Sequence, residues 1–562
     1  MRSAAEQGED FMARRCANVF LDTLALHGVD QFFCVPGESY LGFLDALYDD
    51  PKIRSVTCRH EGGAAYMALA DSKITGRPGV VFASRGPGST NASVAVHAAD
   101  IGATPLVCFF GQVSRKQIHR FPSQQYDFVQ AFGHYCRWVE QVDVAERLPE
   151  IVARAFHLAQ SGTPGPVVVA LPTDVLEEEI EAEPLGPQPA WGAEPSPRDL
   201  DAVAGLLENA ERPVLVVGNE ATSQGARKVL KSFAEQYSLP VMASHCHQHV
   251  IPNDHPNYAG GLGVRPPASI KENAQNADVI LAVGSRMTMK TSLSFTVPSE
   301  NQKLIHVYPD ADMINRLYRT ELGVVSSSEP FMAAMCERNA PPPSDGRKAW
   351  LEKAHQNYVS TSEYQPRESE DGVEFGHVIQ AMKDQLNDEA LISVDVGGFS
   401  SWLYLNYPFK ENQTLIGAES GAMGMGIPGA IAAAIRHPDR QIVGLAGDGG
   451  ALMTGSEIAT AVKENANVVL FISNNGQYGT IREHQEVAHP GRASGINDLV
   501  NPDFASYGEA FGAKGLRIRT PEDAPKVLEE ALAHKGPVVV DVAASLENLS
   551  AQNTITELQA AE

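Results

Sequence analysis

The chain has 562 residues, a length that corresponds to about three or four domains of ordinary size. Hydrophobic residues make up 43% and charged residues 20%, which excludes a largely disordered chain, a coiled coil and a collagen-like fibre. Acidic residues outnumber basic ones, 69 to 44, for a net charge of −25, so a general nucleic-acid-binding role is disfavoured, although a local site can still hold a small anion.

The first third of the chain alternates short β-branched runs with helical patterns, a rhythm that predicts a parallel sheet covered by helices. Helices are expected at residues 62–74 and 90–101. Strands are expected at Gln31–Val35, Ser55–Cys58, Val80–Ser84, Leu106–Phe110 and Val167–Leu171. A proline-rich linker follows at residues 183–198, because such a stretch can continue neither a helix nor a central strand.

The middle and last thirds repeat this alternation. In the middle third, strands are expected at Pro213–Val217, Val241–Ala243, Val279–Val283 and Leu304–Tyr308. A second break at residues 340–347, with the sequence APPPSDGR, separates the two parts. In the last third, strands are expected at Leu391–Val396, Gln441–Ala446, Val468–Ser473 and Val538–Val542.

The first and last thirds end on the same short sequence, Gly-Pro-Val-Val-Val, at residues 165–169 and 536–540. A glycine–proline turn into a buried strand is common by itself. Together with the similar lengths of the two parts, it favours two related α/β domains that flank a third. We therefore predict an α/β chain of three doubly wound parallel-sheet domains, at residues 8–182, 199–340 and 370–548.

The seven cysteines are odd in number, scattered and without a CxxC pair, which indicates reduced thiols rather than a disulfide scaffold. The first twenty residues contain no apolar core of signal-peptide length, and the longest apolar runs in the chain are strand-sized. We expect a cytoplasmic protein that neither binds nucleic acid nor crosses a membrane.

Two polar clusters follow predicted strands in the last third. Residues 447–450 read Gly-Asp-Gly-Gly, and Asn475 comes 27 residues after Asp448. Each cluster alone is an ordinary turn, but the carboxyl ends of parallel strands form the ligand-binding edge of an open sheet. A carboxylate, an amide oxygen and a backbone carbonyl suit Mg²⁺, and the glycines let N–H groups approach a diphosphate. A helix that begins near Thr454 or Gly455 would point its positive end the same way.

At this spacing, the two clusters resemble the diphosphate–metal signature of thiamine-diphosphate enzymes. Residues 59–65 (RHEGGAA) resemble the segment that carries the activating glutamate of that family. Residues 85–91 (RGPGSTN) look like its loop beside the aminopyrimidine ring, and residues 421–426 (GAMGMG) look like the segment that wedges the cofactor into a bent form. The resemblance spans residues 12–545, with the same order of domains. It points to 2-oxo acid decarboxylases and carboligases, and most closely to acetolactate synthases.

This resemblance implies thiamine diphosphate and Mg²⁺ as cofactors, and it assigns roles by position. Glu61 would hydrogen-bond N1′ of the aminopyrimidine and activate the cofactor, and Met423 would be the apolar wedge. Asp448, Asn475 and the backbone carbonyl of Gln477 would be the metal ligands. Further cofactor contacts would be Pro36, Gly37, Pro87, Asn91, Gly398, Phe399, Ser400, Gly421, Gly447, Gly449, Gly450, Tyr478, Gly479 and Thr480.

The substrate side of the resemblance is less uniform. Pyruvate decarboxylases carry an aspartate where Glu38 falls, so Glu38 would shuttle protons, whereas acetolactate synthases have small residues there. His119 and Gln124 lie in a segment that resembles the substrate loop, although an exposed histidine without a role is the plainer interpretation of His119. Ile481 is expected to line the substrate pocket. His484 replaces a tryptophan found in acetolactate synthases that prefer 2-oxobutyrate, and the pattern around it looks more like benzoylformate decarboxylase.

Two features of the middle third carry weaker hypotheses. His245, His247 and His249 alternate, so they would share one face of a strand, but no second cluster of metal ligands accompanies them. Acetolactate synthases bind FAD with a segment in which an arginine is followed by aspartates. The matching residues here, 284–289, include Arg286 but contain no acidic residue. FAD stays open, and a central domain without a nucleotide is the interpretation that we favour.

The resemblance implies decarboxylation of a 2-oxo acid, followed by ligation of the resulting enamine to a second carbonyl, as in acetolactate synthase. Three alternatives remain: a non-ligating, benzoylformate decarboxylase-like enzyme, a lyase that cleaves a C–C bond of a 2-hydroxy compound, and an inactive regulatory protein that binds the cofactor. In this family the first and last domains that build one site belong to different subunits. We therefore expect a homodimer or a homotetramer that acts on a small 2-oxo acid or an aldehyde.

Overall fold

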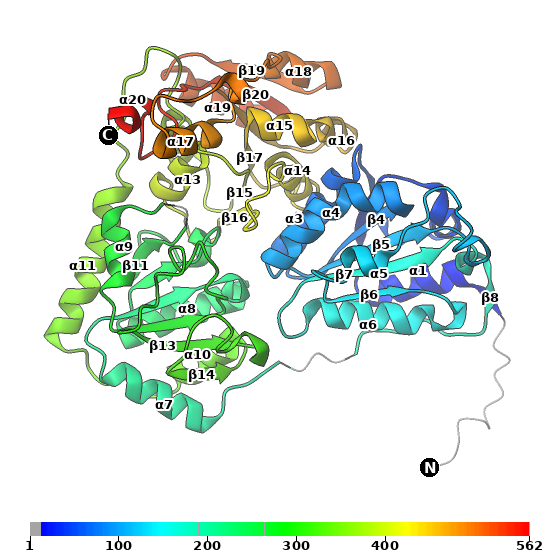
Figure 1. Cartoon of the computed structure of the whole chain (residues 1–562), viewed down its shortest axis with the longest axis horizontal. Helices are drawn as coiled ribbons and strands as arrows, with labels where there is room; N and C mark the ends of the chain where they lie inside the picture. The colour runs from blue at the N-terminus through cyan, green and yellow to red at the C-terminus, as the bar shows by residue number, and fades with distance from the viewer. Residues whose placement is uncertain (1–12, 189–191, 264, 561–562) are drawn as a thin grey trace. The chain divides into compact units, whose positions relative to one another are not determined.

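The computed structural model describes residues 13–188, 192–263 and 265–560, which form two compact units, Met1–Ala190 and Trp191–Glu562 (Figure 1). The first unit contains one six-stranded sheet, and the second contains two. The predicted domain start at residue 8 and part of the predicted linker, residues 189–191, lie outside the described residues.

The sheet of the first unit is parallel throughout and has the strand order β3-β2-β4-β5-β7-β6. Its strands are β2 (Gln31–Cys34), β3 (Arg54–Thr57), β4 (Gly79–Ser84), β5 (Leu106–Gln112), β6 (Trp138–Gln141) and β7 (Pro166–Pro172). The side chains of a strand alternate between the two faces of the sheet. The inner strands are buried on both faces, so helices cover the sheet on both sides. The helices are α1 (Cys16–Leu26), α2 (Leu41–Asp49) and α6 (Leu148–Gln160) on one face, and α3 (Glu61–Thr75) and α4 (Arg85–Ile101) on the other (Figure 1).

The central sheet belongs to the second unit and has the order β11-β10-β9-β12-β13-β14. Its strands are β9 (Pro213–Val217), β10 (Val241–Ala243), β11 (Tyr258–Gly261), β12 (Val279–Val283), β13 (Lys303–Tyr308) and β14 (Leu322–Val325). Helices α8 (Gln224–Tyr237) and α10 (Ser328–Cys336) pack against each other, as do α9 (Ala268–Gln275) and α11 (Asp345–Ser362). When the six strands are numbered along the domain, with β9 as the first, the sheet has the order 3-2-1-4-5-6, which is the order of dinucleotide-binding folds.

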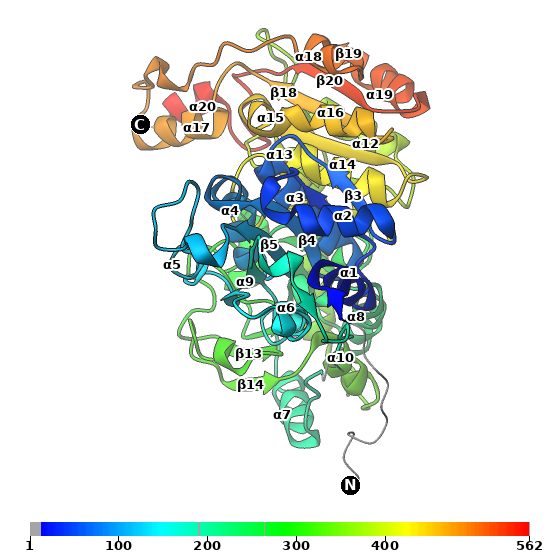
Figure 2. The same ribbon diagram turned by 90° about the vertical axis from the view of Figure 1, so that its right-hand side faces the viewer.

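The last sheet has the order β16-β15-β17-β18-β20-β19. Its strands are β15 (Leu391–Val394), β16 (Thr414–Gly417), β17 (Ile442–Gly447), β18 (Val469–Asn474), β19 (Lys514–Ile518) and β20 (Val538–Ala543). Its core includes α12 (Gly376–Gln385), α13 (Ser400–Asn406) and α19 (Asp523–Ala533). Two further helices, α17 (Gly479–Ala488) and α20 (Ile555–Ala560), lie side by side near the end of the chain (Figure 2).

The first and last sheets share one topology. Numbered within each domain, both have the order 2-1-3-4-6-5, and the repeated Gly-Pro-Val-Val-Val sequence leads into equivalent strands, β7 and β20. Each repeated strand pairs with the fourth strand of its own domain. The prediction of three α/β domains, each built on a parallel sheet, is confirmed.

Every predicted strand is present, but five strands of the three large sheets were not predicted. All five lie at sheet edges, and they are β6, β11, β14, β16 and β19. An edge strand has one neighbour and is less buried, so it needs no continuous β-branched run. The two-residue antiparallel pair of β1 (Arg14–Arg15) and β8 (Glu179–Ile180) was missed as well.

Two predicted helix starts are wrong. Helix α4 begins at Arg85, five residues before the predicted start at 90, because the Gly-Pro-Gly sequence forms its first turn instead of a loop. The expected helix near Thr454 begins earlier, as α15 (Asp448–Thr454), and a 3₁₀ turn at Gly455–Glu457 follows it. Within the described residues, none of the seven cysteines is joined in a disulfide bond. Within the described ranges, no helix has the length and apolarity that a membrane crossing requires.

Candidate active site

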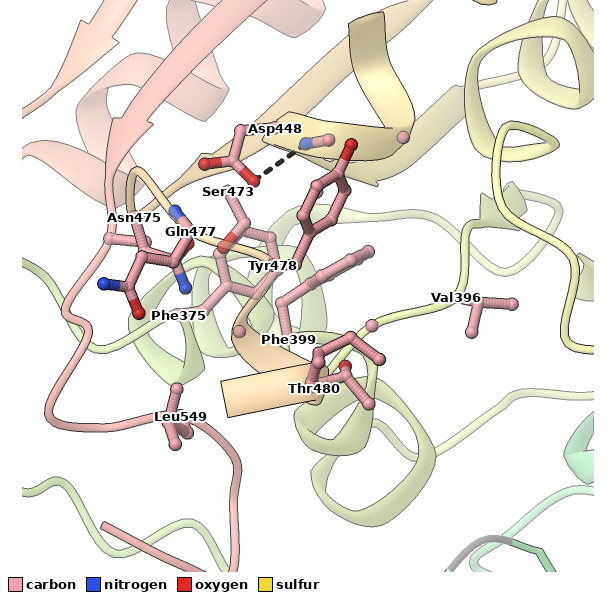
Figure 3. A pocket seen from close by; sticks show the side chains of 18 of the residues that line it. Phe375, Val396, Phe399, Asp448, Ser473, Asn475, Gln477, Tyr478, Thr480 and Leu549 are labelled. Atoms are coloured by element: carbon pink, nitrogen blue, oxygen red, sulfur yellow. Dashed lines mark hydrogen bonds between the residues drawn. The ribbon is translucent and has the colours of Figure 1, made fainter. Parts of the chain in front are cut away.

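A pocket of about 230 Å³ opens at the carboxyl ends of β17 and β18 (Figure 3). Parallel strands expose their last residues at one edge of a sheet, and loops from distant parts of the chain meet there. The pocket is lined by every residue predicted in the last domain for cofactor, metal or substrate, except Ser400. The hydroxyl of Ser400 donates instead to the carbonyl of Gly397, at the start of its own helix.

Asp448 follows β17 directly and is buried, with 4% of its surface exposed. The backbone N–H of Gly449 donates to its Oδ1 at 2.8 Å. The N–H of Gly476 and the Nδ2 of Asn501 donate to its Oδ2, each at 2.8 Å. Burial raises the pKa of Asp448, and these hydrogen bonds oppose that shift because they favour the ionised form. The carboxylate is thus held in one orientation at the pocket wall.

The glycines around Asp448 allow close packing that other residues would prevent. A Cβ atom on Gly449 would lie 2.4 Å from Cε1 of Tyr478, and one on Gly450 would lie 2.3 Å from Oδ2 of Asp395. Both distances are too short for real atoms, so the backbone at 449 and 450 approaches its neighbours as only glycine can. A backbone this close to a pocket suits a ligand that binds to N–H groups.

Asn475 and Gln477 lie in the turn that follows β18. The Oδ1 of Asn475 accepts a hydrogen bond from the N–H of Gln477 at 3.1 Å, and the Nε2 of Gln477 donates to Asp498 at 2.5 Å. The N–H of Gly476 donates to Asp448, so this turn and the end of β17 are tied together. The donor set of carboxylate, amide and carbonyl oxygens that Mg²⁺ prefers is therefore gathered at one place.

Buried polar atoms test whether the pocket fits a polar ligand. Oε1 of Gln477, Oγ1 of Thr480 and Nδ2 of Asn548 are buried and have no hydrogen-bond partner within the described residues, and all three residues line the pocket. Leaving such atoms unpaired costs about 1–3 kcal/mol each. An amide and a hydroxyl that can donate to phosphate oxygens, next to Asp448 and Asn475, fit a metal-bound diphosphate.

A second buried acid, Asp395, lies behind the pocket lining, next to Gly450 and the loop at Gly424. Asp395 follows β15, and both of its oxygens accept from the N–H of Gly424 at 2.9 Å. Burial raises the pKa of Asp395 to about 6. Gly424 has a φ of +99°, and Thr454 donates to its carbonyl at 2.8 Å. Asp395 thereby fixes the loop that brings Met423 to the pocket, within 3.4 Å of where a Cβ of Gly449 would lie.

Glu61 lies in the first unit as the first residue of α3. His60 caps this helix, because its Nδ1 accepts from the N–H of Gly62 at 3.0 Å. The Nδ2 of Asn91 on α4 donates to Oε2 of Glu61 at 2.9 Å. A Cβ on Gly88 would come within 3.0 Å of Oε1, so the glycine lets α4 pass close to the carboxylate. The structure thus joins two residues that were predicted separately for the cofactor, Glu61 and Asn91.

Three family models match the chain in order: the thiamine pyrophosphate enzyme N-terminal TPP binding domain at residues 14–131, the central domain at 200–335 and the C-terminal TPP binding domain at 395–542. The acetolactate synthase large subunit of Parasynechococcus marenigrum is 30% identical to this chain over 94% of the chain and 87% of that protein.

The chain belongs to the thiamine pyrophosphate enzyme family. Thiamine pyrophosphate is another name for thiamine diphosphate, so the protein is a thiamine-diphosphate-dependent enzyme of the decarboxylase and carboligase type. Two other similar proteins are the acetolactate synthase isozyme 3 large subunit of Escherichia coli, 29% identical over 92% of both chains, and the acetolactate synthase large subunit of Lactococcus lactis, 26% identical over 95% of both.

In this thiamine pyrophosphate enzyme, Arg85 connects two of the predicted substrate residues of the first unit. Its Nη1 donates to Oε1 of Glu38 at 2.5 Å and to Oε1 of Gln124 at 3.3 Å. Glu38 follows Pro36 and Gly37, and a Cβ on Gly37 would lie 2.4 Å from Cβ of Ser84. This close approach places the loop after β2 against the end of β4.

His119 is exposed on the loop that follows β5, and its backbone N–H donates to Gln125 at 2.9 Å. No hydrogen bond or ion pair found among the described residues connects its imidazole to Glu38 or Glu61. Pro87, by contrast, lies in the first turn of α4, four residues before Asn91.

Four residues at the sites were not predicted to act there: Arg85, Asp395, Asn501 and Asn548. Asp395 stands at the end of a strand, as Asp448 does, so the same pattern could have identified it. Arg85 is the first residue of the RGPGSTN segment, and nothing in the sequence around it marks a role of its own. Asn501 and Asn548 lie in irregular segments, where neither periodicity nor a strand end marks them.

The histidine segment of the central domain is packed rather than arranged as a metal site. His245 and His247 are buried, and burial lowers the pKa of His245. The Nε2 of His247 lies 3.4 Å from Oε1 of Glu419 in the last domain. In the parts of the chain that the structure describes, no group of three His, Cys, Asp or Glu side chains could hold a metal ion.

The loops at the topological switch point of the central sheet pack directly against each other. The N–H of Gly218 donates to the carbonyl of Val283, and that of Glu220 donates to the carbonyl of Gly284. A dinucleotide-binding fold would place its ligand at this point. FAD, which the sequence left open, is not supported by the family models or by the names of the similar proteins.

Proposed function

We propose that this enzyme decarboxylates a small 2-oxo acid and joins the acyl group that remains to the carbonyl carbon of a second compound, as an acetolactate synthase does. The observation that carries the proposal is the pocket, which combines the oxygen ligands at two strand ends, a glycine cradle and an apolar wall. The similarity to acetolactate synthase large subunits over nearly the whole chain supports it.

Asp448, Asn475 and the carbonyl of Gln477 would hold Mg²⁺, and the N–H groups near Gly449 with Asn548 and Thr480 would bind the diphosphate. Phe399 and Met423 would supply the apolar wall. When bound, thiamine diphosphate supplies a nucleophilic carbon and an electron sink for the decarboxylation. The protein contributes orientation, exclusion of water and proton transfer.

Glu61 is the acid that we assign to proton transfer at N1′ of the aminopyrimidine. Because Asn91 donates to Oε2, the carboxylate cannot rotate freely, and Oε1 stays available to hold or release the proton. Glu38 would move protons on the substrate side. Its side chain is 67% exposed and is kept in place by Arg85.

The same Glu38 favours a second candidate function, a non-ligating decarboxylase. An exposed carboxylate can deliver a proton to the carbon that loses CO₂, and protonation competes with ligation. A C–C lyase that acts on a 2-hydroxy compound would use the same residues in the reverse direction.

A screen of 2-oxo acids for CO₂ release, with Mg²⁺ and thiamine diphosphate present, tests the proposal. We expect release with at least one acid, a ligated product such as acetolactate from pyruvate, and a loss of activity of about 10²–10⁴-fold in Glu61→Gln. Free aldehyde as the sole product supports the second candidate. Equal activity of Glu61→Gln removes Glu61 from the mechanism, and no release from any acid contradicts the proposed reaction.

We further propose that the protein functions as a homodimer or homotetramer. Sedimentation velocity should then give a mass of two or four times the 60.4 kDa chain, whereas a monomer at micromolar concentration would contradict this. The cytoplasmic location stays a prediction.

A further inference from the structure

Arg265 of the central domain contacts the wall of the pocket in the last domain. Its Nη2 lies 2.8 Å from Nδ1 of His484, and its Nη1 lies 2.6 Å from Oε1 of Glu483. His484 lines the pocket, and it belongs to α17 together with Thr480 and Glu483. A residue on the pocket wall is therefore held from a different sheet domain of the same unit.

The backbone of Arg265 is in an unfavourable conformation that its contacts maintain. Its φ is +54°, in the left-handed region that residues with a side chain rarely adopt. The Nε2 of Gln552, near the end of the chain, donates to the carbonyl of Arg265 at 2.6 Å. Strained backbone of this kind persists where the surroundings fix it, and it is concentrated at functional sites.

The contact with Arg265 determines which nitrogen of a neutral His484 carries the proton. A guanidinium group has five N–H donors and no acceptor, so Nδ1 of His484 must be the acceptor of this hydrogen bond. In a neutral imidazole, the proton is then on Nε2. The assignment follows from the donor chemistry of arginine and not from an observed hydrogen atom.

We propose that Arg265 is a positioning residue that keeps His484 in the Nε2–H form, so that the pocket offers a hydrogen-bond donor to an oxygen of the acceptor substrate. That oxygen belongs to either a carbonyl or a carboxylate group. The nature of the substrate rests on the proposed function, but the form of the imidazole does not.

Glu483 determines how the proposal can be tested. Its side chain is 7% exposed, and its Oε1 also accepts from Nδ2 of Asn553 at 2.8 Å. Removing Arg265 alone would leave a buried carboxylate without a counter-ion, a change that often destabilises a protein severely. The informative variant therefore combines Arg265→Met with Glu483→Gln. Glu483→Gln alone is the matched control, because it keeps the contact between Arg265 and His484.

Nitrogen NMR of the full-length protein labelled with ¹⁵N-histidine, recorded at pH 8, reads the imidazole directly. Comparison with His484→Gln identifies the signals. We expect a proton on Nε2 and none on Nδ1 in the wild type and in Glu483→Gln, and a mixture of both forms in the double variant. A wild-type proton on Nδ1, or an unchanged ring in the double variant, overturns the proposal. This readout needs no activity, so its failure is distinct from failure of the proposed function.

Kinetics with the substrates found in the screen provide the second test. The double variant should raise the KM of the acceptor about 10-fold and change kcat less than about 3-fold, the loss of roughly one hydrogen bond. A glutamine amide has N–H donors in any orientation, so it needs no partner that selects a tautomer. When Arg265→Met and Glu483→Gln are made in a His484→Gln background, the KM of the acceptor should therefore rise less than about 2-fold. If the KM rises for acceptors that are 2-oxo acids and not for aldehydes, the substrate oxygen that accepts the hydrogen bond from His484 belongs to the carboxylate. Equal KM increases in both backgrounds show a merely structural role and contradict the proposal.

Discussion

Asp448 is a buried carboxylate whose two oxygens accept hydrogen bonds from three donors. Burial disfavours its charge, and three donors from Gly449, Gly476 and Asn501 favour it. A carboxylate arranged in this way cannot turn away from the pocket. The cost of burying it is offset when a cation binds, which is the reason that such acids are suited to metal sites.

Asn501 provides the first prediction at this scale, because it orients Asp448 without reaching the pocket lining. Its Nδ2 also donates to Oδ1 of Asn474 at 2.9 Å. Asn501→Ala should weaken the binding of Mg²⁺ by about 10–100-fold, the usual cost of losing such a supporting group. Titration of metal-free protein measures this. Asn209 is an exposed asparagine whose side chain donates to the carbonyl of Gly205, so Asn209→Ala should leave the Mg²⁺ affinity unchanged. Equal losses of Mg²⁺ affinity in both variants would refute the role of Asn501 in orienting Asp448.

Glu220 gives a prediction of pH dependence in the central domain. Its carboxylate accepts from the N–H and the hydroxyl of Ser328, and burial raises its pKa from 4.5 to about 7. Because the pKa is higher in the folded state, the wild type loses stability as the pH rises from about 4.5 through 7. Glu220→Gln should be more stable than the wild type at pH 8, by up to about 3 kcal/mol, and equal to it near pH 4. Urea unfolding at the two pH values measures the difference, and a less stable variant at pH 8 is the contrary result.

At the scale of elements, the pocket depends on how closely β17 and the turn after β18 approach each other. Gly449 packs closely against the ring of Tyr478, and both residues line the pocket. The first residues of α17 come directly after this ring, so a shift of Tyr478 would displace Thr480 as well.

Gly449→Ala tests this approach. The new methyl group would need the space of the Tyr478 ring, 2.4 Å away, so we expect thiamine diphosphate to bind at least about 10-fold more weakly, with the secondary structure unchanged. Calorimetry and circular dichroism check the two parts. Gly205→Ala on α7 (Pro197–Glu208) is the control, because no atom lies within 4 Å of its new Cβ and alanine favours helices. Unchanged binding in Gly449→Ala would mean that the cradle is not at this position.

The elements also show what a sequence can and cannot indicate. The central strands were predictable because strands buried on both faces need continuous apolar runs, whereas edge strands such as β16 and β19 do not. In the pocket, Asp448 and Asn475 were predictable because they end strands. Asn501 and Asn548 come from irregular segments whose paths depend on tertiary packing, so no local pattern marks them.

At the scale of the whole molecule, the repeated Gly-Pro-Val-Val-Val sequence predicted correctly that the first and last sheets are related. Both have the strand order 2-1-3-4-6-5, and the central sheet has the order 3-2-1-4-5-6. The chain therefore combines two copies of one domain type with one of another. The contact of Arg265 with Glu483 and His484 was not predictable, because 218 residues separate Arg265 from the first of these partners in the sequence.

Binding of thiamine diphosphate is the measurement that tests the account most directly. Protein stripped of metal and cofactor should take up one thiamine diphosphate per chain in calorimetry when Mg²⁺ is present. Chelation of the metal should abolish this uptake, and Asp448→Asn should weaken it at least about 10-fold. If the stripped wild-type protein takes up no thiamine diphosphate with Mg²⁺ in excess, the pocket at the ends of β17 and β18 is not the cofactor site and the central claim is wrong.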